Sequence, residues 1–298
     1  MQKGRVLVTG RYGFTGRYVA AVLAASGWDV WGLGHRVSPD AGPFDRTADL
    51  TDPDAVTRVI AEIRPDAVLH LAGIAFVAHG DLDDIYRVNL MGTRNLLGAL
   101  ARTGQGARGV VLASSANVYG SAQQTPITED TPVSPANDYA VSKLAMEYAS
   151  KLFADDMPIV TARTFNYTGV GQDPKFLVPK IVAHFRKRAD RIELGNLDVA
   201  RDFSDVRDVA RIYTALLESE AARGQTVNVC SGRSIALGDI IEMCRRFTGH
   251  DMELGVNPAF VRHNEVKVLR ADPARLETLL GKVDRHSFED TLRWMLDA

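Results

Sequence analysis

Short apolar runs alternate with longer amphipathic stretches from the fifth residue onward. The apolar runs are rich in Val, Leu and Ile and have the pattern of strands buried on both faces; they span 5–10, 29–34, 66–73, 109–115, 158–165 and 226–232. Helical patterns separate them at 15–27, 52–65, 89–103, 138–153 and 204–219. Because parallel strands need crossover connections, the alternation predicts an α/β fold, a doubly wound parallel sheet with helices on both faces.

The alternation loosens after Phe165. Segments 166–200 and 231–298 are predicted to contain helices and loops with few strands. They would form a smaller lobe over the carboxyl edge of the sheet, where open α/β sheets bind their ligands. Residues 1–165 and 201–230 are assigned to the sheet domain. The chain is therefore predicted to fold as two interleaved lobes.

Charge and composition exclude several classes of protein. The formal net charge is −2 and the isoelectric point is near 6.4, so no general positive field attracts nucleic acid or an anionic membrane. No apolar run approaches the ~20 residues that span a bilayer, and the N-terminus lacks the features of a signal peptide. Cys230 and Cys244 lack the spacing of a metal site. We expect a soluble, cytoplasmic protein that binds a small molecule and no metal.

Three glycines, Gly10, Gly13 and Gly16, follow the first predicted strand and open the first predicted helix. Glycines at this spacing let a turn approach a pyrophosphate closely, and the helix then presents free N–H groups and its positive dipole end. The turn predicts a dinucleotide site in a Rossmann-type sheet, with Phe14 and Thr15 among its cofactor-binding residues.

Tyr139 and Lys143 lie four residues apart at the start of a helical pattern, which places the phenol and the ammonium on one face of the helix. A free tyrosine titrates near pH ~10 and is a poor proton carrier at neutral pH. A neighbouring cation stabilises the phenolate and moves the pKa of the tyrosine toward the working pH. The pair therefore predicts acid–base chemistry beside the dinucleotide.

These features together resemble the extended branch of the short-chain dehydrogenase/reductase superfamily, which acts mainly on sugar nucleotides. The resemblance rests on three motifs, which are Gly-x-x-Gly-x-x-Gly at 10–16, Ser-Ser-x-x-Val-Tyr-Gly at 114–120 and Tyr-x-x-x-Lys at 139–143. It covers almost the whole chain, with the motifs in the family's order. It implies hydride transfer between a nicotinamide and a sugar carbon, with Tyr139, Lys143 and Ser115 as the catalytic residues.

The resemblance also implies further contacts with the cofactor and the substrate. Asn89 is expected to shape the site from a neighbouring helix, and Asn117 to lie beside the substrate. The remaining cofactor contacts are expected to be an adenine pocket and the end of the fourth strand, formed by Asp49, Leu50, Leu71, Ala72 and Gly73.

The end of the second strand indicates which dinucleotide is bound. NAD sites usually place a carboxylate there, about 20 residues past the glycines, to accept hydrogen bonds from the ribose hydroxyls. This chain has Gly34, His35 and Arg36 instead. A guanidinium suits a 2′-phosphate, so NADP is favoured and NAD remains an alternative.

The two residues after the catalytic serine narrow the reaction. Family members that eliminate water carry acidic groups there, whereas Ala116 and Asn117 do not titrate. Family members that epimerise carbons 3 and 5 use a cysteine nearby, and both cysteines lie far along the chain. Dehydration and 3,5-epimerisation are therefore disfavoured. The missing carboxylate at the end of the second strand favours a 4-keto-sugar reductase over an NAD-dependent 4-epimerase. A dinucleotide sensor without catalysis is disfavoured because Tyr139 and Lys143 are both present.

The second lobe resembles that of family members that bind GDP-sugars. The expected substrate contacts there are Asn166, Val178, Lys180, Arg201, Arg262 and Glu265. The expected reaction is reduction of GDP-4-keto-6-deoxy-D-mannose to GDP-D-rhamnose or to the epimeric GDP-6-deoxy-talose. Helical patterns at 89–101 and 139–153 resemble those that form dimer contacts in the family, so a homodimer is expected.

Overall fold

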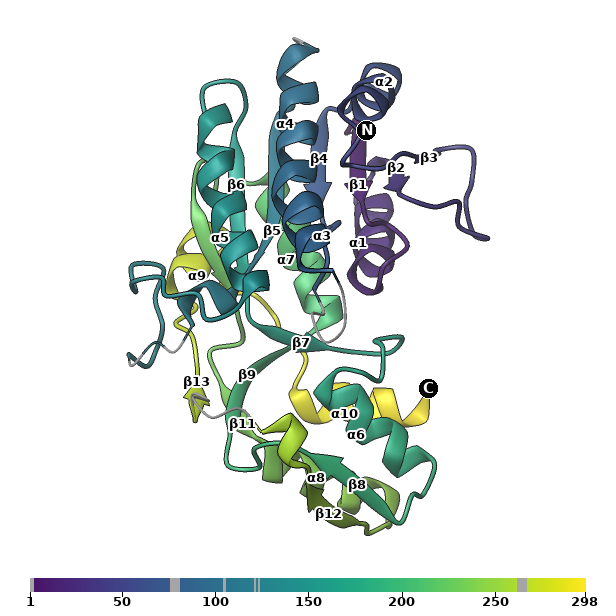
Figure 1. Cartoon of the computed structure of the whole chain (residues 1–298), viewed down its shortest axis with the longest axis vertical. Coiled ribbons are helices and arrows are strands. Elements are labelled where there is room, and N and C mark those ends of the chain that lie inside the picture. Colours follow the sequence, from purple (N-terminus) through teal and green to yellow (C-terminus); the bar gives the residue numbers. More distant parts are fainter. Residues whose placement is uncertain (1–2, 76–80, 104–105, 121, 123, 262–266) are drawn as a thin grey trace.

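The computed structural model describes residues 3–75, 81–103, 106–120, 122, 124–261 and 267–298. Seven parallel strands form the main sheet in the order β10-β6-β5-β4-β1-β2-β3 (Figure 1). They are β1 (Arg5–Thr9), β2 (Asp29–Gly34), β3 (Asp45–Thr47), β4 (Ala67–His70), β5 (Gly109–Ser115), β6 (Ile159–Thr164) and β10 (Thr226–Val229). The predicted α/β fold with a Rossmann-type sheet is confirmed.

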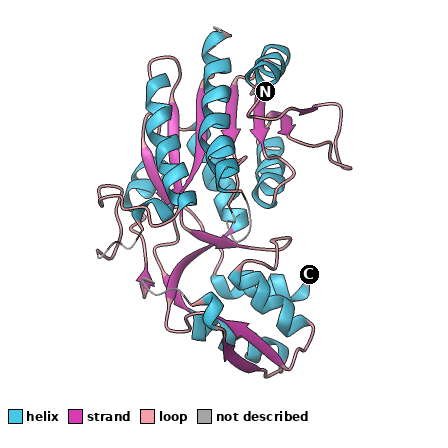
Figure 2. Ribbon diagram, viewed as in Figure 1, coloured by secondary structure: helices cyan, strands magenta, loops and turns pink. Residues whose placement is uncertain are grey.

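Helices cover both faces of this sheet (Figure 2). On one face, α1 (Phe14–Ala25) and α7 (Val206–Glu218) pack over Val6 and Val8 of β1. On the other face, α2 (Pro53–Ile63), α4 (Thr93–Arg102) and α5 (Asp138–Ser150) cover a core cluster that includes Leu7 of β1 and Leu112 of β5. Successive residues of a strand point to opposite faces, which explains why Val6, Leu7 and Val8 are all apolar.

Strand β3 was not expected from the sequence. It is a short segment, Asp-Arg-Thr, that pairs with β2 through Gly32 and Asp45 at the edge of the sheet. An edge strand of three polar residues has no apolar run to identify it.

The smaller lobe lies below the main sheet in Figure 1 and contains two further sheets. Strand β9 (Ala200–Asp205) pairs with β7 (Asn166–Thr168), β11 (Ser234–Ala236) and β13 (Val268–Leu269). Strand β8 (Arg191–Leu194) pairs with β12 (Glu253–Val256). Few strands were expected here, and that expectation was wrong because these strands are too short to show a periodic pattern.

Helices complete this lobe. They are α6 (Leu177–Arg186), α8 (Leu237–Thr248) and α10 (Phe288–Asp297), which share a core with β8 and β9, and α9 (Ala274–Leu280), which packs against β10. Short helical segments occur elsewhere as α3 (Leu82–Tyr86), η1 (Arg87–Gly92), η2 (Ala116–Tyr119), η3 (Lys151–Phe153) and η4 (Pro258–Phe260).

The chain passes repeatedly between the two lobes. It leaves the main sheet after β6, returns through α7, and leaves again after β10. Asp202 of β9 joins the crossings, because its buried carboxylate accepts hydrogen bonds from the N–H groups of Ser231 and Gly232 at 2.8 and 2.9 Å. The division at 165, 200 and 230 remains our proposal; β9 itself pairs with strands of the smaller lobe.

Within the described residues, no helix is long and apolar enough to cross a bilayer. Cys230 and Cys244 are both buried free thiols.

Candidate active site

The glycine-rich turn joins β1 to α1 in a conformation that requires its glycines. Gly10 has a φ of +70°, and a Cβ on Gly16 would lie 2.2 Å from the carbonyl oxygen of Gly10. Gly13 precedes the first turn of α1 and no side chain caps that helix end. The N–H groups of the first helical turn are thus left for a ligand, and the turn fits the pyrophosphate of a dinucleotide.

Phe14 and Thr15 connect this turn to the smaller lobe. The hydroxyl groups of Thr15 and Tyr167 lie 2.8 Å apart, and the rings of Phe14 and Tyr167 stack with their centroids 6.0 Å apart. The hydroxyl of Tyr18, one helical turn on, donates to the carbonyl oxygen of Val170 at 2.7 Å. The predicted phosphate-binding helix therefore lies directly against the segment that follows the main sheet.

The predicted adenosine contacts lie around the ends of β2 and β3. Arg36 is exposed just beyond β2. The exposed carboxylate of Asp49 accepts hydrogen bonds from the N–H and hydroxyl groups of Thr51, which lower its pKa. Leu50 is buried, and a Cβ on Gly92 would lie 2.9 Å from its Cβ. Leu50 thus packs closely against the helical segment that holds Asn89.

Arg11 and Asp45 also lie in this region, and the sequence analysis assigned neither residue. The guanidinium of Arg11 contacts the carboxylate of Asp45 at 2.6 Å, and that side chain is only 5% exposed. The pair lies over Gly32, where a Cβ would come within 2.1 Å of the carboxylate.

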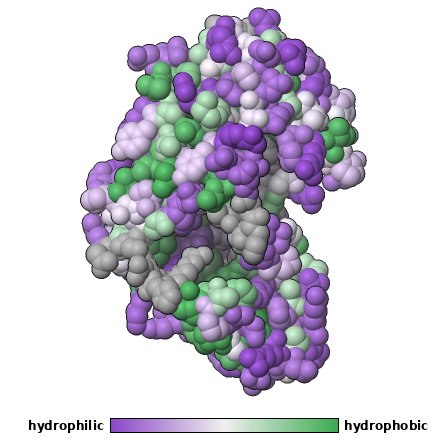
Figure 3. Space-filling model, in the orientation of Figure 1, coloured by the Kyte–Doolittle hydropathy of each residue, from purple (hydrophilic) through white to green (hydrophobic). Residues whose placement is uncertain are grey.

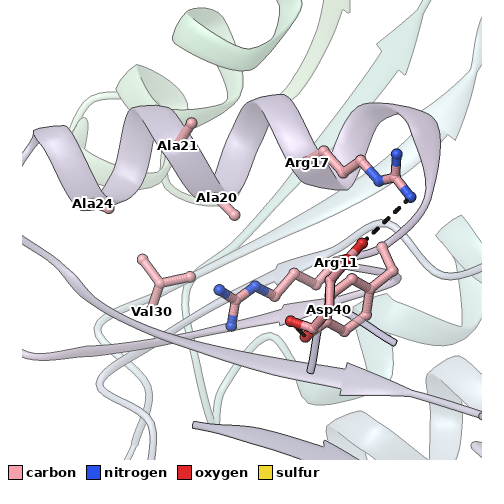
Figure 4. Close-up of a pocket in the computed structure, with 8 residues that line it drawn as sticks. Arg11, Arg17, Ala20, Ala21, Ala24, Val30 and Asp40 are labelled. Atoms are coloured by element: carbon pink, nitrogen blue, oxygen red, sulfur yellow. Dashed lines mark hydrogen bonds and ion pairs between the residues drawn. The ribbon is translucent and has the colours of Figure 1, made fainter. Parts of the chain in front are cut away.

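A pocket of about 430 Å³ opens beside this ion pair, between α1 and β2 (Figure 4). At its rim Arg17 faces Asp40 across 3.9 Å. The position of Arg11, directly after the first glycine of the turn, is the sequence feature that could have indicated this ion pair. The adenosine end of the site therefore contains more charge than the end of β2 alone indicates.

Tyr139, Ser115 and Lys143 converge at the carboxyl ends of β4 and β5. Helix α5 begins where the side chain of Asn137 accepts a hydrogen bond from the N–H of Ala140 at 2.9 Å, which places Tyr139 in the first turn. The pKa of Tyr139 was expected to shift toward the working pH, and that expectation was wrong: burial raises it to about 12, and a hydrogen bond with Ser115 offsets only part of the rise. The Nζ of Lys143 donates to the carbonyl oxygen of Ala113 at 2.8 Å, and burial lowers the pKa of Lys143 to about 8.

Asn89 connects the catalytic helix to the end of β4. Its side-chain oxygen accepts from the N–H of Ile74 at 2.8 Å, and its amide donates to the hydroxyl of Ser142 on α5 at 3.0 Å. A Cβ on Gly73 would lie 2.9 Å from the Asn89 oxygen and 3.2 Å from the Nζ of Lys143. Asn89 lies in η1, a π-helical segment, and such segments are frequent at functional sites.

His70 lies behind the predicted cofactor contacts Leu71, Ala72 and Gly73. It is fully buried between the hydroxyl groups of Thr9 and Thr93, at 2.7 and 2.9 Å. Burial and the charge of Lys143 lower its pKa to about 3. The neutral ring is therefore part of the support for the strand end.

The predicted substrate residues occupy the side of the smaller lobe and the mouth of the site. Asn117 and Asn166 are exposed, and Val178 is buried in the first turn of α6. Lys180 donates to the carbonyl oxygen of Glu193 at 2.6 Å, and Arg201 to that of Ala200 at 2.9 Å. Arg262 and Glu265 lie outside the described residues. The surface is hollowed between the two lobes (Figure 3).

No cluster of three or more histidine, cysteine or acidic side chains suited to a metal ion occurs in the part of the chain that the structure describes. Asp81, in an acidic run before α3, caps that helix by accepting a hydrogen bond from the N–H of Asp83 at 2.9 Å.

Comparisons with known proteins agree with the family resemblance seen in the sequence motifs. The NAD dependent epimerase/dehydratase family matches residues 6–230. The chain is 34% identical to GDP-6-deoxy-D-talose 4-dehydrogenase of Aggregatibacter actinomycetemcomitans, over 93% of this chain and 91% of that protein. It is also 34% identical to GDP-6-deoxy-D-mannose reductase of Pseudomonas aeruginosa, over 98% of this chain and 96% of that protein.

Among solved structures, the chain is similar to RMD from Pseudomonas aeruginosa complexed with NADPH. The TM-score is 0.86 at 32% sequence identity, and the match covers 99% of this chain and 98% of that one.

Proposed function

Because this chain belongs to the NAD dependent epimerase/dehydratase family, we propose that it reduces the 4-keto group of a nucleotide sugar with NADPH or NADH. One observation carries the proposal. Tyr139, Ser115 and Lys143 meet at the strand ends beside a glycine-rich turn that fits a dinucleotide. The names of the two relatives support the class of substrate, since both act on GDP-linked 6-deoxyhexoses at 34% identity.

The turn at Gly10, Gly13 and Gly16 would hold the pyrophosphate of the dinucleotide, which when bound would supply the hydride for the sugar carbon. Tyr139 donates the proton to the sugar oxygen, because its raised pKa keeps the phenol protonated at neutral pH. Ser115 hydrogen-bonds the same oxygen and orients it. Lys143, a buried cation four residues further along α5 than Tyr139, would stabilise the phenolate that remains.

The groups around Ser115 favour simple reduction over elimination. Asn117 donates its backbone N–H to the Ser115 hydroxyl at 3.2 Å, and its side chain does not titrate. Ala116 is buried. Elimination of water needs an extra acid and base at the reacting carbons, and these two positions supply neither.

NADPH is the proposed cofactor. Arg36 provides an exposed guanidinium at the end of β2, where a carboxylate would repel a 2′-phosphate. The NADPH complex of a protein 32% identical in sequence supports the same choice.

We propose GDP-4-keto-6-deoxy-D-mannose as substrate and GDP-D-rhamnose or GDP-6-deoxy-talose as product. Arg201 and Lys180 would hold the diphosphate and the nucleotide from β9 and α6. Arg262 and Glu265 are assigned to the phosphate and the ribose from sequence alone.

We also propose a homodimer formed through α5 and its neighbours. Hydrophobic side chains lie over part of this face (Figure 3). The exposed apolar residues of α3, η1, α5 and η3 are Leu82, Met91, Val141, Tyr148 and Leu152. Light scattering should give twice the 32.5 kDa chain mass at micromolar concentration, and Tyr148→Glu with Leu152→Glu should give the monomer. A monomeric wild-type protein would refute this assembly.

The decisive experiment mixes purified protein with NADPH and GDP-4-keto-6-deoxy-D-mannose and follows the nicotinamide absorbance, then repeats it with NADH. Stoichiometric oxidation establishes the reductase, and the configuration of the product at carbon 4 distinguishes rhamnose from talose. Absence of oxidation refutes it. Denatured protein is then tested for retained NAD, and UDP- and GDP-hexoses for interconversion, which identifies the 4-epimerase alternative.

A further inference from the structure

A buried ion pair lies one helical turn beyond the candidate catalytic lysine. Glu147 follows Lys143 by four residues on α5, so the two side chains lie on the same face of the helix. Its carboxylate meets the guanidinium of Arg163 on β6 at 2.7 Å, and the Nε of Arg163 lies 3.1 and 3.2 Å from its two oxygens. The two side chains are 6% and 10% exposed.

The pair is hydrogen-bonded on every side. Ser114, the neighbour of Ser115 on β5, donates its hydroxyl proton to the carboxylate of Glu147. Arg163 donates to the hydroxyl of Tyr119 at 3.0 Å, and that hydroxyl donates to the side-chain oxygen of Asn228 at 2.7 Å. Glu147 thus joins α5 to β5, whose end carries Ser115, and to the neighbouring strand β6.

Stability alone does not account for this arrangement. Well-packed apolar side chains in place of a buried ion pair are often neutral or stabilising, because desolvation of the two charges offsets their attraction. The charges do have a buried neighbour of functional interest. Lys143 is itself buried, so an anion on the next turn acts on it with little screening by water.

We propose that Glu147 is a positioning residue, whose carboxylate keeps Lys143 in its ammonium form and holds the end of β5 so that Ser115 faces Tyr139. Arg163 balances that carboxylate and limits its pull on Lys143. The consequence for turnover rests on the proposed reductase function, whereas the effect on Lys143 does not require a substrate.

Among the described residues, four titratable or charged groups matter for Lys143. They are Glu147 and Tyr139, each four residues away on α5, His70, whose pKa the charge of Lys143 lowers, and Arg163, which pairs with Glu147. Burial lowers its pKa to about 8, and the charge of Glu147 acts in the opposite direction. Tyr139, with a pKa of about 12, and His70, with a pKa of about 3, stay neutral near pH 8. Arg163 stays charged, because the carboxylate raises its pKa. The charges of Glu147 and Arg163 are therefore the ones whose removal should shift the pKa of Lys143.

The test is a pH titration of Lys143 in the full-length protein labelled with ¹³C at lysine Cε, with the signal assigned by its absence in Lys143→Met. Glu147→Gln should lower the midpoint by about one pH unit, because an attractive charge is lost and Arg163 is left unopposed. Arg163→Gln should raise it. The double variant Glu147→Gln with Arg163→Gln should return most of the way to wild type, and Glu147→Asp should stay close to wild type.

Tyr119→Phe is the matched control. It removes a hydrogen bond from Arg163 without altering any charge, so it should lower the melting temperature and leave the Lys143 midpoint unchanged. If Glu147 had only a structural role, the Lys143 midpoint would shift in the same direction in all variants, or it would shift in none of them. That result, or an unshifted midpoint in Glu147→Gln, would overturn the proposal, and the Arg163→Gln and double variants decide it if Glu147→Gln does not fold.

Kinetics provide the second readout. In Glu147→Gln the decline of kcat at high pH should begin about one pH unit lower than in wild type. If wild type shows no turnover, the reductase proposal fails on its own, and the order of the Lys143 midpoints still decides the role of Glu147.

Discussion

Arg11 and Asp45 form an ion pair of 2.6 Å that lies over Gly32. Arg11 directly follows Gly10, the first glycine of the predicted phosphate-binding turn. The carboxylate comes from β3, although strand β2 ends without one. It also accepts a hydrogen bond from the N–H of Gly42 at 2.7 Å, which holds the preceding loop. The carboxylate of Asp45 is thus already paired with an arginine at the predicted adenosine end of the site.

Asp45→Asn should tighten binding of NADPH relative to NADH by roughly tenfold. The change frees Arg11 for the 2′-phosphate and removes a nearby negative charge, and one charge-assisted hydrogen bond is worth about 1.5–3 kcal/mol. Asparagine keeps an oxygen for the Gly42 N–H. Calorimetric titration with each cofactor measures the ratio, and an equal change for both would show that Asp45 does not act on the 2′ position.

Arg36→Asp should weaken NADPH binding more than NADH binding, by roughly ten- to a hundredfold in the ratio. The change replaces a guanidinium at the end of β2 by a carboxylate that repels the phosphate. Arg58→Asp, on an exposed position of α2, carries the same change of charge and should leave the ratio unaltered. Equal losses for the two cofactors in Arg36→Asp would defeat the assignment.

Tyr139→Phe should lower kcat by at least about 10²-fold, because the proton donor is removed. Dinucleotide binding, followed by quenching of tryptophan fluorescence, should persist within roughly twofold, since the phenol contributes little to the phosphate site. Turnover at the wild-type rate would exclude Tyr139 from the mechanism and would favour the dinucleotide sensor.

His70 should make stability depend on pH. Its pKa is about 3 in the folded protein, whereas an unfolded histidine titrates near pH ~6.5, so the unfolded chain binds more protons in this window and stability falls as the pH drops through it. His70→Asn removes this dependence. Between pH 7 and pH 5 the difference in unfolding free energy between variant and wild type should change by about 2 kcal/mol in favour of the variant. Urea unfolding at the two pH values measures it, and a constant difference would contradict the assigned neutral ring.

Asp52→Ala should lower the free energy of unfolding by about 1 kcal/mol. The side chain of Asp52 caps α2 by accepting hydrogen bonds from the N–H groups of Asp54 and Ala55, both at 3.0 Å. Asp52→Asn retains an acceptor and should cost only a few tenths of that. Chemical denaturation of both variants checks the difference, and equal losses would mean that the cap geometry is unimportant.

The sequence predicts the main sheet except for β3, because the other strands lie in continuous apolar runs and buried parallel strands need that composition. The smaller lobe shows the limit of this reasoning. Strands β7, β11 and β13 have three, three and two residues, and their pairing depends on contacts with β9 that no local pattern encodes.

The candidate site divides in the same way. Motif spacing predicted Tyr139 and Lys143 on one helix face, and the structure brings Ser115 to them from β5. Asp45 and Arg163 escaped assignment as site residues because their partners, Arg11 and Glu147, lie 34 and 16 residues away in the chain. Charged residues that meet only through the fold carry no local signal of the contact.

Because the chain crosses between its lobes after β6, before α7 and after β10, neither lobe is one continuous stretch of sequence. Asp202 and the Thr15–Tyr167 contact join the lobes at those crossings. The smaller lobe therefore cannot be exchanged between relatives as one continuous segment of sequence. Evolution or an engineer must change sugar preference in this scaffold by point substitutions and loop replacements, while the cofactor half stays in place.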